Sequence, residues 1–490
     1  MDDDRVPVIV GVGELADRPG RLAQALEPIA LMESALRRAE RDAGAALLAR
    51  LDGLEIINEI SWPYSDPCAL LAERLDARRA ECTYHPVGGQ TPMLAIHRAA
   101  LAIQAGAWRV AAICGAESQA SVTAAGRAGF DLPWHPRVVD FVPTRGAAYQ
   151  QAIARTLDFA TPAHVYPFYE SATRAMWRQT LAEAQAESGT IWSHNASIAR
   201  QRDAAWIHRE VSPKEIVEPS ADNRLIAWPY TKLMMANPGV NQGAAVLVCS
   251  LAIARELGIG NNGIVHIHGG AAADEPRDYL ARRTYRRSPA MEWVLGRASD
   301  LTEERGFDAV ELYSCFPVVP KMARRTLGLA TEAPLSIAGG LTFFGAPLNN
   351  YMTHAAVAMV ERLRRTRGRG LLYAQGEYVT KHHALVLDTE APVAPLREDY
   401  RRPDDTDLAV AALGYSGPAQ AEAATILYDR AGAVRHGGVL LKTPAGERLL
   451  ARVPAEYEET IGAIRSDQGV VDRLGVASIA SDGTPEWRVD

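Results

Sequence analysis

One order of strand-like and helical segments occurs twice along this chain. Runs rich in β-branched residues alternate with amphipathic helical patterns. The first series opens with VPVIVGVGE at 6–14 and a helical pattern at 28–44, and the second opens with NGIVHIHGGA at 262–271 and a helical pattern at 289–300. Because strands that alternate with helices form sheets covered by helices, this order predicts an α/β fold. The repetition predicts an internal duplication.

Two further regions depart from that order. Between about 120 and 235 the regularity weakens and tryptophan, histidine and proline accumulate, which predicts a mostly helical insertion. Near the end, short strands separated by DRAG, TPAGE and SDGT predict a small all-β, barrel-like unit. We therefore expect a first half at 1–258 that contains the insertion, a second half at 259–392, a linker of Pro, Asp and Arg at 393–407, and a C-terminal domain at 408–490.

Composition excludes several classes of function. The 490 residues carry a net charge of −7, which gives no electrostatic reason to bind nucleic acid. The start, MDDDRVPV, is acidic and lacks the basic segment of a secretory signal. The longest later apolar run, at 243–254, is too short to cross a bilayer. We expect a cytoplasmic protein with no nucleic-acid partner and no membrane insertion.

Cysteines and histidines give no sign of a metal site. The five cysteines are odd in number and widely scattered, which fits neither a disulfide framework nor paired zinc ligands. Neither HIH at 266–268 nor KHH at 381–383 has metal-ligand spacing on a known scaffold. We expect no metal and no resident cofactor, and we interpret four cysteines as packing residues: Cys68, Cys82, Cys114 and Cys249.

Four segments, in this order, resemble landmarks of the thiolase superfamily. They are VGGQTP at 87–92, ANPGVNQGAAVLVCS at 236–250, DAVELYSCF at 308–316 and AGGLTFFGAP at 338–347. The third is most similar to the His-Asp-Cys-Phe motif of sterol-carrier-protein-type thiolases. Over roughly residues 5–390, the resemblance implies two duplicated α/β halves in five layers with an inserted loop domain. The tail makes the chain similar to thiolase-like proteins of type 1, often labelled acetyl-CoA acetyltransferase, and itself resembles an oligonucleotide-fold unit.

The same resemblance implies that the usual thiolase catalysts are replaced. Thiolase chemistry needs a thiolate, a base and donors for the thioester oxyanion. The nucleophilic cysteine falls on Gly88, the histidine of Gly-His-Pro on Ala346, and the second cysteine on Ala374. The asparagine of Asn-Glu-Ala-Phe falls on Tyr313. Scaffold glycines remain at Gly89, Gly339, Gly340, Gly345 and Gly376, so we expect the pocket without its familiar chemistry.

Three residues are candidate catalysts. Tyr313 is either a general acid or base or a packed tyrosine. Cys315, where a strand ends and a helix begins, is either an acid/base thiol, as in sterol-carrier-type enzymes, or a packing residue. Successive strand residues point to opposite faces, so at most one of His382 and His383 faces the site. We name His382, and as substrate-binding candidates His85, Gly88, Gly89, Gln90, Ser314, Phe316, Gly345, Ala346, Asn349, Asn350, Tyr351 and Gly376.

Three functions stay open. The first is an acyltransferase-like protein of lipid metabolism that handles acyl-CoA or CoA, with doubtful thiolase activity. The second is a retro-aldol lyase on β-hydroxyacyl-CoA that uses Tyr313, and the third is a non-catalytic CoA binder or scaffold. Basic residues of the insertion are candidates to meet the CoA phosphates: Arg174, Arg178, Arg200, Arg202, Arg209, Arg224 and Lys232. The resemblance implies a homodimer, and a monomer if the extra domain blocks pairing.

Overall fold

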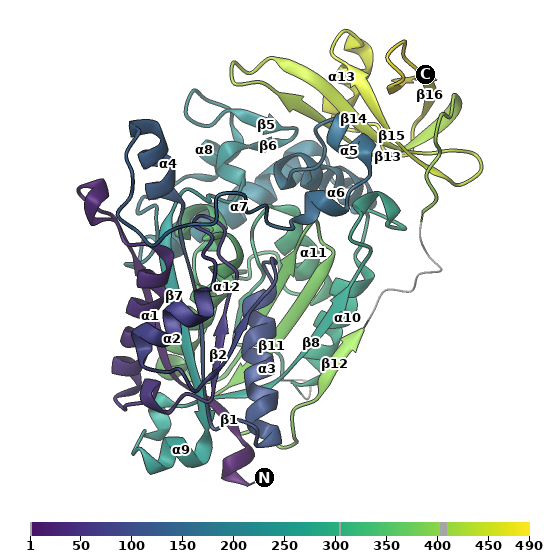
Figure 1. Ribbon diagram of the computed structural model, residues 1–490. Coiled ribbons are helices and arrows are strands. Elements are labelled where there is room, and N and C mark those ends of the chain that lie inside the picture. Colours follow the sequence, from purple (N-terminus) through teal and green to yellow (C-terminus); the bar gives the residue numbers. More distant parts are fainter. Residues whose placement is uncertain (1, 303–304, 402–408) are drawn as a thin grey trace.

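The structure, a computed structural model, describes residues 2–302, 305–401 and 409–490. Its main body contains two sets of strands (Figure 1). The first has the order β3-β2-β4-β7-β1 and consists of β1 (Pro7–Ala16), β2 (Gly53–Ile56), β3 (Glu81–Tyr84), β4 (Val110–Ser118) and β7 (Asn241–Ser250). The second has the order β9-β10-β11-β8 and consists of β8 (Val265–Asp274), β9 (Ala309–Glu311), β10 (Arg369–Gly376) and β11 (Lys381–Asp388).

The two sets pair in the same pattern. In the first, β2 is parallel to β4, and β4–β7 and β7–β1 are antiparallel. In the second, β9 is parallel to β10, and β10–β11 and β11–β8 are antiparallel. A short antiparallel pairing of β1 with β8 joins the sets. The predicted α/β class is confirmed, and the repeated pairing is what a duplicated chain produces.

Helices form the other layers. The central layer is α3 (Thr91–Ala105) with α12 (Tyr351–Thr366), because both contact strands of the two sets. On the outer faces, α1 (Pro28–Ala43) and α2 (Pro67–Leu75) accompany the first set and α10 (Pro289–Asp300) the second. Residues 351–360 of α12 are all buried, as expected for a helix enclosed between two sheets.

The insertion is mostly helical, as its composition predicts. It contains α4 (Gln119–Ala128), α5 (Ala152–Thr156), α6 (Pro162–Met176), α7 (Leu181–Ala199), α8 (Pro213–Val217) and the short strands β5 (Leu225–Ala227) and β6 (Tyr230–Thr231). α7 begins with a capping box in which Thr180 and Glu183 satisfy each other's backbone N–H groups. Two more helices belong to the halves, α9 (Leu251–Glu256) and α11 (Val318–Thr326).

The C-terminal domain is a closed five-stranded barrel with one helix. Its order is β14-β15-β17-β16-β13, closed by β13–β14, and its elements are β13 (Gly417–Tyr428), β14 (Val434–Lys442), β15 (Arg448–Pro454), α13 (Glu458–Arg465), β16 (Leu474–Ile479) and β17 (Pro485–Val489). The oligonucleotide-fold identity stays a prediction. In Figure 1 the barrel lies beside the insertion, and β13 extends its sheet to β5 through Leu427 and Ala227.

Two details differ from what the sequence indicates. Within the expected linker, Glu398–Arg401 forms β12, which runs parallel to β8. Residues 402–407 of the expected linker, and residue 408 at the expected start of the C-terminal domain, lie outside the described part of the chain. The interpretation of Cys68 and Cys82 as packing residues is wrong, because they form a disulfide between α2 and β3 with a Cα–Cα distance of 5.8 Å. Their positions on neighbouring elements bring them together although 14 residues separate them.

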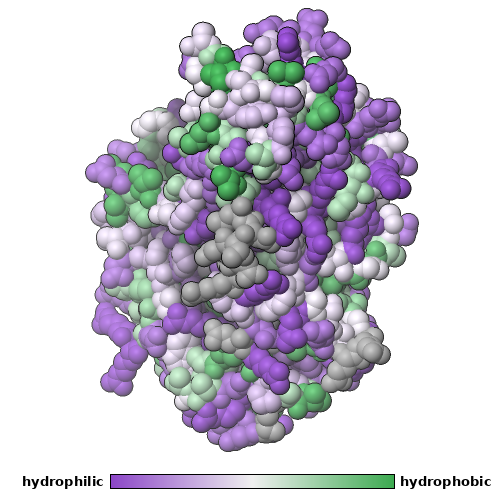
Figure 2. Space-filling view, turned by 90° about the vertical axis from the view of Figure 1, so that its right-hand side faces the viewer, coloured by the Kyte–Doolittle hydropathy of each residue, from purple (hydrophilic) through white to green (hydrophobic). Residues whose placement is uncertain are grey.

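None of the helices within the described ranges has both the length and the apolar composition needed to span a bilayer. Figure 2 shows a face on which hydrophilic residues predominate and hydrophobic ones form small separate groups.

Candidate active site

The turn before α3 is where the resemblance places the thiolase nucleophile. The chain leaves β3, passes the glycine pair and enters α3 at Thr91, with Pro92 in the first turn, where a missing N–H costs nothing. The N–H of Gly88 donates to Oδ1 of Asn349 (2.9 Å), and Nδ2 of Asn349 donates to the carbonyl of Asn58 (2.9 Å). A carboxamide from the second half therefore holds the turn of the first.

Two side chains fill the space beside the glycines. A Cβ added to Gly88 or to Gly376 would overlap the carboxamide oxygen of Gln90. A Cβ added to Gly89 would overlap the hydroxyl of Tyr313. The predicted residues Gly88, Gly89, Gln90, Tyr313 and Gly376 thus meet at one place, and Gln90 occupies the volume beside Gly88.

Tyr313 has an unusual backbone conformation. Strand β9 ends at Glu311, and Tyr313 has a φ of 52°, a left-handed conformation that costs a non-glycine residue about 1–2 kcal/mol. Burial, with a smaller contribution from Cys315, raises the pKa of the Tyr313 hydroxyl above its ordinary value. Within the described ranges this hydroxyl has no hydrogen-bond partner. Tyr313 is therefore a neutral phenol in contact with the glycine turn.

The carboxylate of Glu311 organises the segment around Tyr313. It is fully buried and accepts hydrogen bonds from Ser336 Oγ (2.7 Å), the Ile337 N–H (3.0 Å) and Tyr351 (3.0 Å). Burial raises the pKa of Glu311. The hydroxyl of Tyr351 also accepts a hydrogen bond from the Gly340 N–H (3.1 Å). The predicted substrate-binding residue Tyr351 therefore links Glu311 to the backbone at Gly340.

Cys315 lies in a buried polar group with two residues from other elements. Nε2 of Gln375, on β10, donates to Sγ of Cys315 (3.1 Å) and to the hydroxyl of Tyr166 (2.6 Å), on α6. Burial raises the pKa of the Cys315 thiol to about 12 despite these bonds. The effect of burial exceeds that of these hydrogen bonds, so Cys315 is a thiol at neutral pH and not a thiolate.

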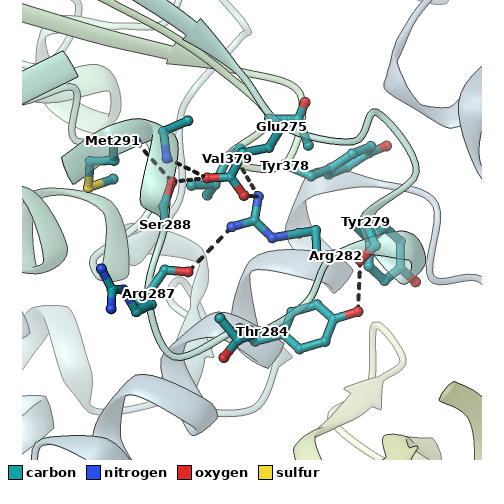
Figure 3. A network of polar contacts seen from close by, with 12 residues as sticks. Glu275, Tyr279, Arg282, Thr284, Arg287, Ser288, Met291, Tyr378 and Val379 are labelled. Carbon is teal, nitrogen blue, oxygen red and sulfur yellow. Dashed lines mark hydrogen bonds and ion pairs between the residues drawn. The ribbon is translucent and has the colours of Figure 1, made fainter. Parts of the chain in front are cut away.

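His382 belongs to a network behind the site. Its Nδ1 bonds to the Tyr373 hydroxyl (2.7 Å), and its Nε2 lies 3.3 Å from Ser288 Oγ. Ser288 bonds to Glu275, which forms a buried ion pair with Arg282 (2.5 Å; Figure 3). Burial lowers the pKa of His382 to about 3, so the ring is neutral. Both ring nitrogens bond to protein groups, and a proton-transfer role would require His382 to give up one of these bonds.

The other predicted substrate-binding residues form contacts with protein groups outside the glycine turn. His85 bonds to the buried carboxylate of Glu55, and Ser314 Oγ accepts from Asn195 Nδ2 (3.2 Å). The ring of Phe316 stacks on Tyr166 with centroids 4.3 Å apart.

Asn350, Ala346 and Gly345 also have partners. Nδ2 of Asn350 donates to the Gly115 carbonyl (2.5 Å), and the Ala346 N–H donates to the Asn237 carbonyl (2.9 Å). Gly345 lies against Gln242, and a Cβ there would crowd that carboxamide. Asn350, Ala346 and Gly345 hold the backbone in place.

Sequence reasoning missed Tyr166, Gln375 and Asn58. Gln375 stands within AQG, the segment that resembles the second thiolase cysteine, so a closer reading of that segment would have found it. Nothing in the insertion marks Tyr166, which meets Gln375 across 209 positions of the chain.

Most of the basic candidates for phosphate contacts are engaged elsewhere. Arg174 donates to the Asp467 carbonyl of the barrel (2.6 Å), and Arg202 pairs with Glu14 and Glu361. Across the described ranges, no group of three or more His, Cys, Asp or Glu side chains is placed to hold a metal ion.

Comparisons with known proteins identify the fold. No family model matches the sequence, and no curated protein matches it. Among solved structures, a monomeric SCP2-thiolase-like protein type 1 from Mycobacterium smegmatis has a TM-score of 0.82 at 24% identity, covering 99% of this chain and 100% of that one.

Two further structures match about four fifths of this chain. The Ltp2–ChsH2(DUF35) aldolase has a TM-score of 0.59 at 18% identity (80% of this chain, 99% of that one). The dimeric peroxisomal thiolase of Saccharomyces cerevisiae has a TM-score of 0.55 at 11% identity (79% and 98%). The resemblance to the thiolase superfamily is confirmed in the fold.

Proposed function

We propose that this chain binds acyl-CoA or CoA and does not catalyse thiolysis. The observation that carries the proposal is the position of Gln90: its carboxamide occupies the volume beside Gly88 where an acyl-accepting side chain would stand. The nearby thiol, Cys315, is protonated because burial raises its pKa to about 12. The thiolase fold supports an acyl-thioester ligand, and these two features oppose covalent acyl transfer.

Polar groups at the turn support binding without transfer. A carboxamide such as that of Gln90 presents N–H donors to a thioester oxygen without forming a covalent bond. Tyr313 adds a neutral hydroxyl beside Gly89. Similar proteins are labelled acetyl-CoA acetyltransferases. For this chain, that label would reflect common descent with thiolases and not an acyl-transfer activity.

Two measurements on the purified protein test this function. Calorimetry with CoA and acetoacetyl-CoA should give heats of binding. Incubation with acetoacetyl-CoA and CoA should produce no acetyl-CoA above the uncatalysed background. Turnover at ordinary thiolase rates, or absence of binding to either thioester or CoA, would overturn the proposal.

A retro-aldol lyase is the second candidate, favoured by the free hydroxyl of Tyr313. In such a cleavage a base removes the β-hydroxyl proton, the Cα–Cβ bond breaks to release a carbonyl compound, and an acid protonates the acyl-CoA enolate. Because burial raises its pKa, Tyr313 is protonated at neutral pH and carries the proton that the acid must give, but it is a weaker acid than an ordinary phenol. Tyr313→Phe should then abolish cleavage of a β-hydroxyacyl-CoA, and unchanged turnover would refute this candidate.

The oligomeric state belongs to the same proposal. Among the described residues, the barrel contacts α6 and β5 of the insertion through β13, and residues 280–286 through Arg448 and Asp472. We propose that this arrangement leaves the edge strand β3 available for pairing with a second copy of the chain. Sedimentation at increasing concentration distinguishes a homodimer from a monomer.

A further inference from the structure

A groove of about 800 Å³ lies where the two halves and the insertion meet. Its walls include residues 12–16 of β1, Arg38 of α1, residues 201–204 after α7, and Val357, Glu361 and Arg365 of α12. Neither the glycine turn at 85–90 nor Tyr313, Cys315 or His382 lines it. The groove is therefore separate from the candidate active site.

The charges on its inner wall are matched within the protein. Arg202 pairs with Glu14 and with Glu361 (3.1 Å), and Glu14 also bonds to His354 (2.8 Å). The side chain of Arg202 is only 12% exposed, yet its Nε has no hydrogen-bond partner within the described ranges. A buried donor without an acceptor is rare in native structures, and it indicates an acceptor supplied from outside the chain.

Two further arginines of the groove have no carboxylate partner. Within the described ranges, the side chain of Arg38 donates only to the carbonyl of Glu14 (3.0 Å), and Arg365 forms neither a hydrogen bond nor an ion pair. Both residues are exposed and line the groove. Because a guanidinium binds a carboxylate through two parallel N–H groups, each of them can receive one carboxylate of a ligand.

Packing fixes the backbone that carries these two arginines. A Cβ added to Gly13 would overlap the backbone of α1 and the Cβ of Arg38, so α1 packs directly against β1. Arg365 lies in the last turn of α12, and the adjacent Arg364 anchors that turn to Asp42 (2.7 Å). The two elements are therefore in place before a ligand arrives, which lowers the entropy lost on binding.

The other walls add an apolar surface and one acidic group. Val12, Leu15 and Val357 are buried and line the groove. Asp203 is exposed, lines the groove and forms no side-chain hydrogen bond or ion pair in the described part of the chain. The unpaired charges are thus two guanidiniums against one carboxylate, which favours an anion. The apolar side chains suit a short carbon chain.

We infer that this groove binds a small dicarboxylate. One carboxylate pairs with Arg38 and the other with Arg365, and the carbon chain between them lies against Val12, Leu15 and Val357. Such a ligand connects α1 of the first half to α12 of the second. The site is independent of the acyl-thioester site of the proposed function.

Calorimetry with succinate tests this inference. Succinate should bind the wild-type protein, and acetate, which has one carboxylate, should bind at least about tenfold more weakly. Arg38→Met and Arg365→Met should each lower the affinity for succinate about tenfold or more, because each removes charge-assisted hydrogen bonds. Both arginines are exposed, so the two variants should unfold at the same temperature as the wild type.

Arg362→Met is the matched control. Arg362 is also an exposed arginine of α12 whose side chain has no partner within the described ranges, but it does not line the groove. Its affinity for succinate should equal that of the wild type. Asp203→Asn should tighten binding about two- to fivefold, because it removes a like charge beside the ligand. Raising salt from about 0.05 M to about 0.5 M should weaken binding.

The outcomes separate a site at the groove from a general effect of charge. If neither succinate nor glutarate binds, the inference is wrong. It is also wrong if Arg362→Met loses as much affinity as Arg365→Met, or if inorganic phosphate binds more tightly than succinate, because a carbon chain would then contribute nothing.

CoA provides the test of independence. Its binding should not change in Arg38→Met or in Arg365→Met, and a parallel loss of CoA and succinate binding would refute a separate site. If succinate binds as expected and CoA does not bind, the inference stands and the proposed function is wrong.

Discussion

The turns that precede the two central helices differ in how their carboxamides are used. Before α12, both Asn349 and Asn350 use the oxygen and the nitrogen of their amides in hydrogen bonds within the protein. Before α3, the oxygen of Gln90 has no partner in the described part of the chain, and neither has that of the adjacent Asn58. In the second-half turn the carboxamides therefore hold the backbone in place. In the first half, Gln90 and Asn58 instead line a pocket with carboxamide oxygens that have no partner in the described part of the chain.

The buried acids of the two halves extend this contrast. Glu311, in the second half, is surrounded by hydrogen-bond donors. In the first half, burial and then the mutual repulsion with Glu117 raise the pKa of Glu59 to about 8, and burial raises that of Glu117 to about 7. The first half therefore buries two acids that keep their protons to a higher pH than ordinary glutamates, Glu59 beyond neutral pH and Glu117 up to about pH 7.

The contribution of Glu59 and Glu117 to stability should fall as pH rises, and this is the largest effect we expect. Above about pH 4.5 the two carboxyls of Glu59 and Glu117 ionise in the unfolded chain but stay protonated in the folded one, so unfolding releases protons. Between about pH 5 and pH 8 the contribution of these two carboxyls to the unfolding free energy should drop by roughly 3–5 kcal/mol, measured by urea unfolding as the difference between the wild type and a variant with both Glu59→Gln and Glu117→Gln, because the buried histidines His382 and His383 act in the opposite sense below about pH 6.5 in both proteins. Glu59→Gln should flatten this dependence, and a slope unchanged in that variant would show that another group causes it.

Removing a satisfied carboxamide should cost more than removing an unsatisfied one. Asn349→Leu leaves the Gly88 N–H and the Asn58 carbonyl unpaired, so the unfolding free energy should fall by about 2–4 kcal/mol. Gln90→Met breaks no hydrogen bond of its carboxamide oxygen and should change stability by less than about 1 kcal/mol. If both variants lost the same unfolding free energy, the contrast between the satisfied carboxamide of Asn349 and the unsatisfied one of Gln90 would be wrong.

The smallest expected effect is on thiol chemistry in the second half. With a pKa of about 12 and only 5% exposure, Cys315 should resist iodoacetamide at pH 8. Peptide mapping should find it unmodified in the native protein and alkylated after unfolding in urea. Rapid native labelling would mean that the site opens or that the thiol is activated.

The sequence predicts regular elements well where local signals are strong. The helix expected at 28–44 is α1 at Pro28–Ala43, ended by Gly44 with a φ of 66°, and the helix expected at 289–300 is α10 with those bounds. The strand expected at 308–315 is shorter, because Tyr313 leaves extended geometry two residues after β9 ends.

For the site, the resemblance located the glycine turn and Tyr313 but not the groups that complete them. Asn58, Tyr166 and Gln375 come from segments far apart in the sequence, and no local pattern distinguishes a carboxamide with a partner from one without. The contrast between Gln90 and Asn349 depends on tertiary contacts alone.

Native mass spectrometry of the protein with acetoacetyl-CoA tests the central claim most directly. It reports in one spectrum whether the thioester binds and whether an acyl group becomes covalently attached. We predict a non-covalent complex that releases intact acetoacetyl-CoA on activation and leaves the protein at its original mass. A protein that keeps an acyl group, or that forms no complex at all, would contradict the account.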